Sequence, residues 1–108
     1  MSVTPITNIT EFRQIIEGDK PTLIDFWAVW SSPCRLIRPK FEDLSNKPDN
    51  AGIGYYSVDV DDQGDIAQEV GVRAMPTFML FQKGQKVGEV VGANPEGLNS
   101  LVEEGKTL

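Results

Sequence analysis

The chain has 108 residues, 40% of them hydrophobic and 24% charged, with a formal net charge of −6 at pH 7, no histidine and one cysteine. This length suits a single domain spanning residues 1–108 with a core of its own, and one cysteine excludes an intrachain disulfide. Scattered cations argue against a nucleic-acid partner, and the lack of a secretory signal or of roughly 20 consecutive apolar residues argues against a membrane partner and favours a cytoplasmic protein.

Strand and helix patterns alternate along the whole chain, which indicates an α/β protein. A short edge strand is expected over residues 3–6, and Asn8 is a good N-cap for a helix that Gly18 ends. The nearly continuous apolar run of residues 22–28 predicts a central strand covered on both faces. This strand also contains Asp25, and a charge at such a position requires an explanation.

A longer helix is expected after residue 32, with apolar residues at helical spacing through Pro39. Because proline lacks an N–H and crowds the preceding turn, it should kink the helix at that point. The apolar face of this helix is expected to contain Leu36, Ile37, Phe41 and Leu44.

Residues 53–60 are expected to form a second central strand, and a short helix around residues 66–70 is expected to end before Gly71. Two further strands, over residues 77–81 and 86–91, are joined by a turn in which Gly84 supplies a positive φ.

A closing helix is indicated by Asn94-Pro95, a cap followed by a first-turn proline, and by an apolar stripe of Leu98, Leu101 and Val102. The elements together predict a mixed central β-sheet with helices on both faces.

The most informative motif is Trp30-Ser31-Ser32-Pro33-Cys34-Arg35, which follows the central strand directly. The strand, this motif and the later run Val72-Arg73-Ala74-Met75-Pro76-Thr77-Phe78 resemble the thioredoxin family, in which Trp-Cys-Gly-Pro-Cys occupies the position of the motif. The resemblance covers almost the whole chain and implies the thioredoxin fold. The segment around Arg73 to Thr77 and that around Asp59 are similar to the fungal and other eukaryotic branch.

The resemblance places Ser31 where the family carries its attacking cysteine. A serine hydroxyl is not ionised at neutral pH without a strong base, and oxygen cannot replace sulfur in thiol–disulfide exchange. We therefore interpret Ser31 as a helix N-cap rather than as a serine nucleophile. Ser32 replaces the glycine that is usual in the family.

The resemblance identifies Cys34 as the second, resolving cysteine and Asp25 as the buried aspartate beneath it, which accepts and returns a proton. Burial should raise the pKa of Asp25 and suit it to general base chemistry. Two interpretations of Cys34 stay open. It is either an inert buried thiol or a reactive monothiol that accepts glutathione or links two chains.

Met75-Pro76 matches the family's cis-proline loop, which offers backbone groups to a bound peptide. We expect a shallow apolar patch beside Ser31 and Cys34 that holds an extended peptide, while Trp27 supports the core. The patch is expected to contain Trp30, Pro33, Met75, Pro76, Gly92 and Ala93.

The resemblance implies a protein-disulfide oxidoreductase scaffold that is redox-impaired because its nucleophile is missing. Its partners would be disulfide-containing or extended peptide segments of proteins, and thioredoxin reductase. The alternatives are a redox-silent peptide-binding module and a monothiol protein acting through Cys34. No cofactor is predicted, and the acidic cluster near Asp59 lacks the spacing of a metal site.

Overall fold

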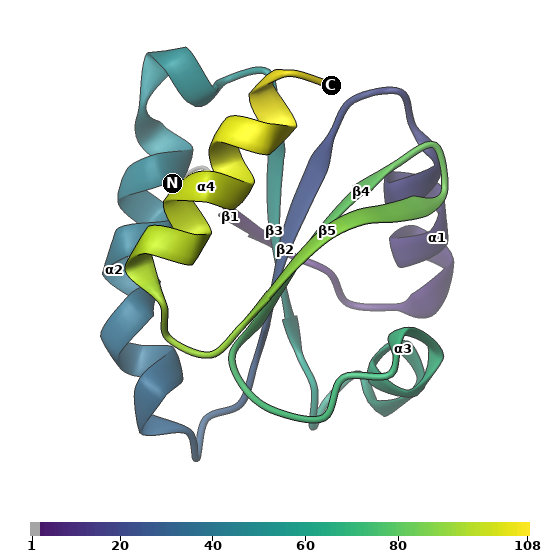
Figure 1. Ribbon diagram of the computed structural model, residues 1–108. Coiled ribbons are helices and arrows are strands. Elements are labelled where there is room, and N and C mark those ends of the chain that lie inside the picture. Colours follow the sequence, from purple (N-terminus) through teal and green to yellow (C-terminus); the bar gives the residue numbers. More distant parts are fainter. Residues whose placement is uncertain (1–2) are drawn as a thin grey trace.

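A five-stranded sheet forms the centre of the computed structural model, which describes residues 3–108 (Figure 1). The elements in chain order are β1 (Val3–Pro5), α1 (Ile9–Glu17), β2 (Thr22–Trp27), α2 (Ser32–Asn46), the short 3₁₀ helix η1 (Pro48–Asn50), β3 (Gly54–Asp59), α3 (Gly64–Val70), β4 (Thr77–Gln82), β5 (Gln85–Val91) and α4 (Pro95–Lys106). The predicted alternation of strands and helices is confirmed.

The strand order is β1-β3-β2-β4-β5, so β2 is the middle strand. It pairs in parallel with β3 and antiparallel with β4, which makes the sheet mixed, as predicted. In this register Asp25 lies opposite Ser57 on one side and Phe78 on the other. The central strand is therefore hydrogen-bonded along both edges.

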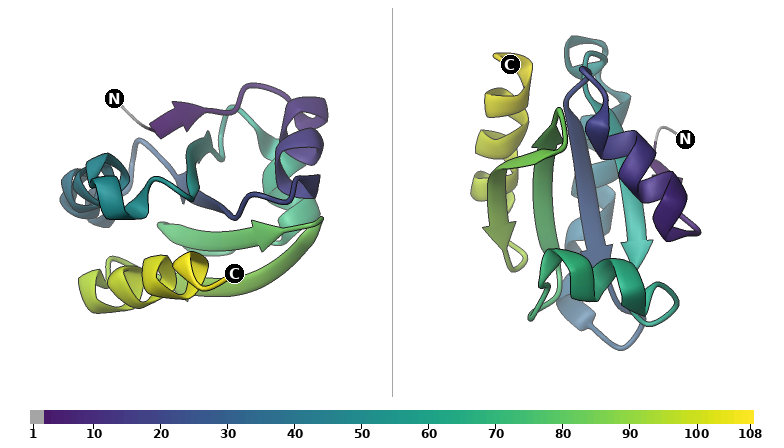
Figure 2. Two further views of the ribbon diagram at one scale, coloured as in Figure 1. Left: turned by 90° about the horizontal axis from the view of Figure 1, so that it is seen from above. Right: turned by 90° about the vertical axis from the view of Figure 1, so that its right-hand side faces the viewer.

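Helices cover both faces of the sheet. α2 and α4 lie on one face, and α1 and α3 lie on the other, as both views in Figure 2 show. Because side chains alternate along a strand, β2 supplies Leu23 to the first face and Ile24 to the second. Both faces of β2 are therefore covered by helices, which explains why its sequence is an almost continuous apolar run.

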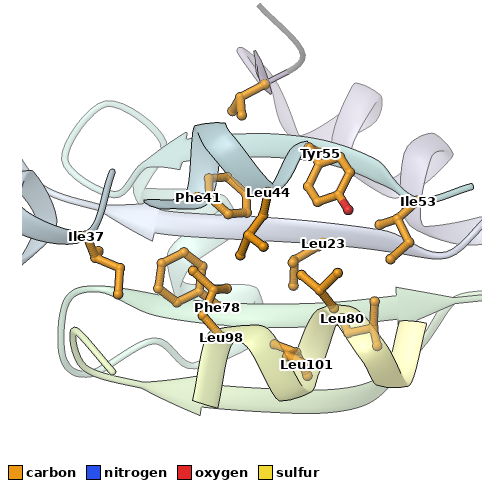
Figure 3. Close-up of a cluster of buried hydrophobic side chains, with 12 residues drawn as sticks. Leu23, Ile37, Phe41, Leu44, Ile53, Tyr55, Phe78, Leu80, Leu98 and Leu101 are labelled. Carbon is orange, nitrogen blue, oxygen red and sulfur yellow. The ribbon is translucent and has the colours of Figure 1, made fainter. Parts of the chain in front are cut away.

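The larger core lies between the sheet and the pair α2 and α4 (Figure 3). Phe41 is its aromatic centre, with its ring centroid 5.3 Å from that of Phe78 and 5.9 Å from that of Tyr55. The smaller core, on the α1 and α3 side, is built around Phe12 and Phe81, whose rings meet edge to face.

Local hydrogen bonds fix the ends of the elements. Asn8 and Asn94 act as N-caps, each accepting a backbone N–H three residues on, as predicted. The β4–β5 turn has positive φ at both Lys83 and Gly84, of which only the glycine was predicted. The N–H groups of both residues donate to carbonyls at the end of α1, and these bonds hold Lys83 in its left-handed conformation.

The prediction that Leu36 belongs to the buried face of α2 is wrong, because its side chain is 78% exposed. The buried stripe runs through Cys34, Ile37, Phe41 and Leu44, which follow the 3-4-3 spacing of one helical face. Leu36 lies about 100° around the helix from Ile37 and therefore points to solvent. Pro39 lies inside an otherwise continuous helix.

The observed strands differ slightly from the predicted ones. β3 begins at Gly54 and ends at Asp59, one residue inside the predicted limits at each end, and β4 extends to Gln82. Within residues 3–108, no helix combines the length and the apolar character needed to cross a membrane.

Replacing Phe41 by alanine should lower the free energy of unfolding by about 3–5 kcal/mol, because a fully buried ring leaves a cavity between two aromatic neighbours. Urea denaturation followed by circular dichroism measures this change. Leu36→Ala on the same helix is the matched control and should change the free energy by less than about 0.5 kcal/mol. A large loss for Leu36→Ala would contradict its position on the surface.

Candidate functional site

Four loops meet at one edge of the sheet, because the strand register brings their ends together. Trp27 at the end of β2 pairs with Asp59 at the end of β3, and Phe26 pairs with Thr77 at the start of β4. Thr77 in turn pairs with Val91 at the end of β5. Residues 28–31, 60–63, 71–76 and 92–94 therefore form a four-loop edge, seen at the lower end of the sheet in Figure 1.

Ser31 joins the first of these loops to α2. Its backbone is extended, its N–H donates to the Ala28 carbonyl at 3.2 Å, and its side-chain oxygen accepts from the Cys34 N–H at 3.4 Å. These contacts confirm the predicted helix N-cap. The residue is only 5% exposed, and no histidine exists in the chain to activate its hydroxyl.

Cys34 lies in the first turn of α2 and is 2% exposed. Of the two interpretations of Cys34, this burial favours the inert thiol. A thiol in this position is shielded from solvent and faces the sheet together with the other buried residues of α2.

Arg35 ties the motif together through contacts that could not be predicted from its sequence. Its Nη1 donates to the Val29 carbonyl at 2.8 Å, and its Nη2 donates to the Ser32 hydroxyl at 3.1 Å. Both serines of the motif thus take part in hydrogen bonds that hold the loop against the start of the helix.

Asp25 lies on the face of β2 that α2 covers, and it is 1% exposed. Its Oδ2 is 4.0 Å from Nη2 of Arg38, and its Oδ1 has no hydrogen-bond partner among the described residues. Burial raises the pKa of Asp25 to about 7, and the positive charge of Arg38 lowers that pKa in part. The carboxyl therefore titrates near neutral pH.

The Met75–Pro76 peptide bond is cis. Pro76 is buried, and its carbonyl accepts from the Gly92 N–H at 2.7 Å. Thr77 also fixes this loop, since its hydroxyl donates to the Ala74 carbonyl at 2.6 Å. These bonds hold the loops that contain Pro76 and Gly92 side by side at the four-loop edge.

The residues predicted to form a peptide-binding patch differ in exposure. Trp30 is 64% exposed and Pro33 is also exposed, Met75 is half-buried, and the Pro76 ring is buried. Ala93 is exposed and lines an apolar pocket of about 230 Å³ together with Leu36, Ile37, Lys40 and Pro95.

Trp30 is anchored by a contact that the sequence did not indicate. Its indole Nε1 donates to Oδ2 of Asp61 at 3.0 Å. Asp59, in the same acidic cluster, accepts from the N–H groups of Asp61 and Asp62 and so caps its own turn. Among residues 3–108, no group of three or more histidine, cysteine or acidic side chains is placed to hold a metal ion.

Comparison with known proteins agrees with this geometry. The thioredoxin family profile matches residues 3–104. The chain belongs to the thioredoxin family. It is 49% identical over 102 residues to a thioredoxin of Malassezia sympodialis, covering 94% of this chain and 97% of that protein, and 45% identical over 104 residues to human thioredoxin with the same coverage.

Solved thioredoxin structures share the architecture. The Malassezia sympodialis thioredoxin structure superposes with a TM-score of 0.94 at 47% identity, covering 98% of this chain and 95% of that one. Mitochondrial thioredoxin 3 of Saccharomyces cerevisiae gives a TM-score of 0.88 at 39% identity, with 95% of each chain covered. The predicted thioredoxin fold is confirmed.

In this thioredoxin-family chain, Asp25→Asn should raise the free energy of unfolding at pH 8 by about 2–4 kcal/mol. The folded carboxyl has a pKa of about 7, above its unfolded value, so stability falls as pH rises from about 4 to about 7. The gain should shrink to about 0.5 kcal/mol near pH 4, where the folded carboxyl is neutral and the unfolded one is about half ionised. Urea unfolding at both pH values tests this, and an equal effect at both would contradict it.

Ser31→Ala should lower the free energy of unfolding by about 1 kcal/mol, because the Cys34 N–H loses the Ser31 side-chain oxygen as its acceptor at the start of α2. Chemical denaturation measures the loss. Ser32→Ala, at the neighbouring exposed position, is the control and should cost less than about 0.5 kcal/mol. If the two losses were equal, the capping role of Ser31 would be refuted.

Proposed function

We propose that this chain is a thioredoxin of the fungal and eukaryotic type whose scaffold serves thiol–disulfide exchange but whose attacking cysteine is replaced by Ser31. The observation that carries the proposal is the placement of Ser31 at the N-cap of α2, with Cys34 one turn further and Asp25 buried beneath. Relatives named thioredoxin match along nearly the whole chain. We assign residues 1–108 to a single thioredoxin domain.

The chemistry of the scaffold explains why the serine matters. A thiolate at position 31 would attack one sulfur of a substrate disulfide, form a mixed disulfide and release the other sulfur as a thiol. Cys34, losing its proton to Asp25, would then attack the mixed disulfide and free the second substrate thiol. Two electrons pass to the substrate, and the protein becomes a disulfide. A serine oxygen cannot begin this sequence, so the chain as written is redox-impaired.

The helix start is suited to a thiolate, which also supports the proposal. The dipole of α2 places partial positive charge at its N-terminus, which favours negative charge on the residue at the N-cap. The N–H of Cys34 already points at the Ser31 oxygen. A sulfur at the same position would be stabilised as an anion by the same donor.

The proposed partners are disulfide-containing or extended peptide segments of proteins, and thioredoxin reductase. The peptide would lie across the four-loop edge and contact the patch of Trp30, Pro33, Met75, Pro76, Gly92 and Ala93. The hydrogen bond from Trp30 to Asp61 supports this assignment, since it holds an exposed indole in one orientation. A cytoplasmic location stays a prediction.

A redox-silent peptide-binding module is the second candidate function. Large apolar side chains are exposed near the motif, at Val29, Trp30, Leu36 and Val91, and none of them needs a thiol to bind a partner. The third reading, a monothiol acting through Cys34, conflicts with the burial of that side chain.

Insulin-disulfide reduction in the presence of dithiothreitol tests the proposed function. The Ser31→Cys/Ser32→Gly variant should exceed the parent rate by at least about 100-fold, the order expected when a missing nucleophile is restored. The control adds Cys34→Ser to the restored variant, and it should lose multiple turnover because the mixed disulfide is not resolved.

Two results would contradict the proposal. A parent chain as active as the restored variant would show that Ser31 does not impair the chemistry. A restored variant as inactive as the parent would show that the surroundings no longer support exchange, and peptide binding would then be the function to pursue.

A further inference from the structure

Two buried polar atoms under the motif lack hydrogen-bond partners among residues 3–108. They are Oδ1 of Asp25 and Nη2 of Arg38, and they belong to the two side chains of one ion pair. Buried polar groups are almost always satisfied in folded proteins, so this pair requires an explanation. The pair is also unequal, since Asp25 is 1% exposed and Arg38 is 33% exposed.

Arg38 is held in place by the strand that carries Asp25. Its guanidinium carbon lies 4.6 Å from the centre of the Trp27 ring, within cation–π distance. Trp27 and Asp25 are two residues apart on β2 and therefore share a face of the sheet. Arg38 therefore contacts two side chains of β2, the Trp27 ring at 4.6 Å and the Asp25 carboxyl at 4.0 Å.

Arg38 supplies the positive charge that acts on the Asp25 carboxyl, and the other groups described around Asp25 are uncharged or engaged elsewhere. Across the sheet, Asp25 pairs with Ser57 of β3 and Phe78 of β4, neither of which is charged. The nearest acidic neighbour on β3 is Asp59, whose carboxylate is engaged with the N–H groups of its own turn. From α4, the face toward the core presents Leu98 and Leu101.

The helix adds one titratable group to this face. Cys34 lies four residues before Arg38 on α2, so the two side chains share one side of the helix. Arg38 reaches Asp25 from that side, and Cys34 is buried on it. The thiol and the cation therefore lie on the side of α2 that faces the strand carrying Asp25.

We infer that Arg38 is a positioning residue for Asp25: its guanidinium, fixed on Trp27, favours the carboxylate form of the buried acid and so sets the pH at which that acid can take a proton from Cys34. The first half of this inference concerns the ion pair alone. The second half, the exchange with Cys34, rests on the proposed function.

The positive charge that acts on Asp25 does not change with pH. A guanidinium stays protonated throughout the range in which Asp25 titrates, so its field on the carboxyl is constant. Burial raises the pKa of Asp25 to about 7, and without Arg38 it would be higher still. Partial exposure of the guanidinium lets water solvate it while the carboxyl stays dry.

A ¹³C NMR titration of the Asp25 carboxyl tests the ion-pair half on the chain as it stands, with Asp25→Asn used to assign the signal. Arg38→Met keeps the length of the side chain and removes its charge, and it should raise the titration midpoint by about 1 pH unit. Arg38→Lys keeps a charge without the planar stack, and it should raise the midpoint by less than half of that.

Lys40→Met is the matched control, because it removes one positive charge from the same helix at a side chain that lines the apolar pocket with Leu36 and Pro95. It should shift the midpoint by less than about 0.2 pH units, since solvent screens the more distant charge. An unchanged midpoint in Arg38→Met, with native circular dichroism, would overturn the inference. If that variant does not fold, Arg38→Gln provides the same neutralisation and the same criterion.

The exchange with Cys34 is tested in the Ser31→Cys/Ser32→Gly background by the pH dependence of insulin reduction. Adding Arg38→Met should move the profile to higher pH by the same amount as the NMR midpoint. A moved NMR midpoint with an unmoved rate profile would overturn the link to Cys34. An inactive background would overturn the proposed function, and the NMR result would still decide the role of Arg38.

Discussion

The pairing of β2 with a strand on each side is the constraint on which the site depends. Because β3 is parallel to β2 and β4 is antiparallel, the carboxyl ends of β2 and β3 meet the start of β4 and the end of β5 at one edge. A one-residue slip of β2 would turn Asp25 to the opposite face of the sheet. The two cores packed against Leu23 and Ile24 prevent this slip, so the packing that stabilises the fold also positions the site.

The side-chain atom at position 31 can have two roles, one as a helix cap and one in disulfide exchange. The oxygen of Ser31 accepts the Cys34 N–H, and helix capping requires only such an acceptor. Disulfide exchange requires sulfur, because only a thiolate both attacks and leaves at neutral pH. In the function proposed for this chain, an oxygen at this position keeps the helix start but cannot carry out the exchange. The bonds of Arg35 to Val29 and Ser32 further hold this loop without any thiol.

The fold and the order of its elements could be predicted from the sequence, because apolar periodicity, caps and turn residues act locally and agree with one another. The contacts of Trp30 with Asp61 and of Arg38 with Asp25 could not, because they join residues distant in the chain and depend on rotamers. The exposure of Leu36 was missed for a different reason. An apolar residue beside a buried stripe looks like part of it unless the angle around the helix is fixed by its neighbours.

The buried carboxyl of Asp25 lowers the free energy of unfolding, and the fold does not require a charged group at this position. A hydrophobic side chain at position 25 would suit a strand that pairs on both sides and is covered on both faces. Asp25 must instead be desolvated, and its ion-pair partner among residues 3–108 is Arg38, at 4.0 Å. Natural chains tolerate such destabilising groups where proton transfer is needed. Arg38 reduces this destabilisation only in part. A carboxylate with all of its hydrogen bonds made would hold no proton near neutral pH. The incomplete ion pair is thus suited to the proton exchange proposed for Asp25.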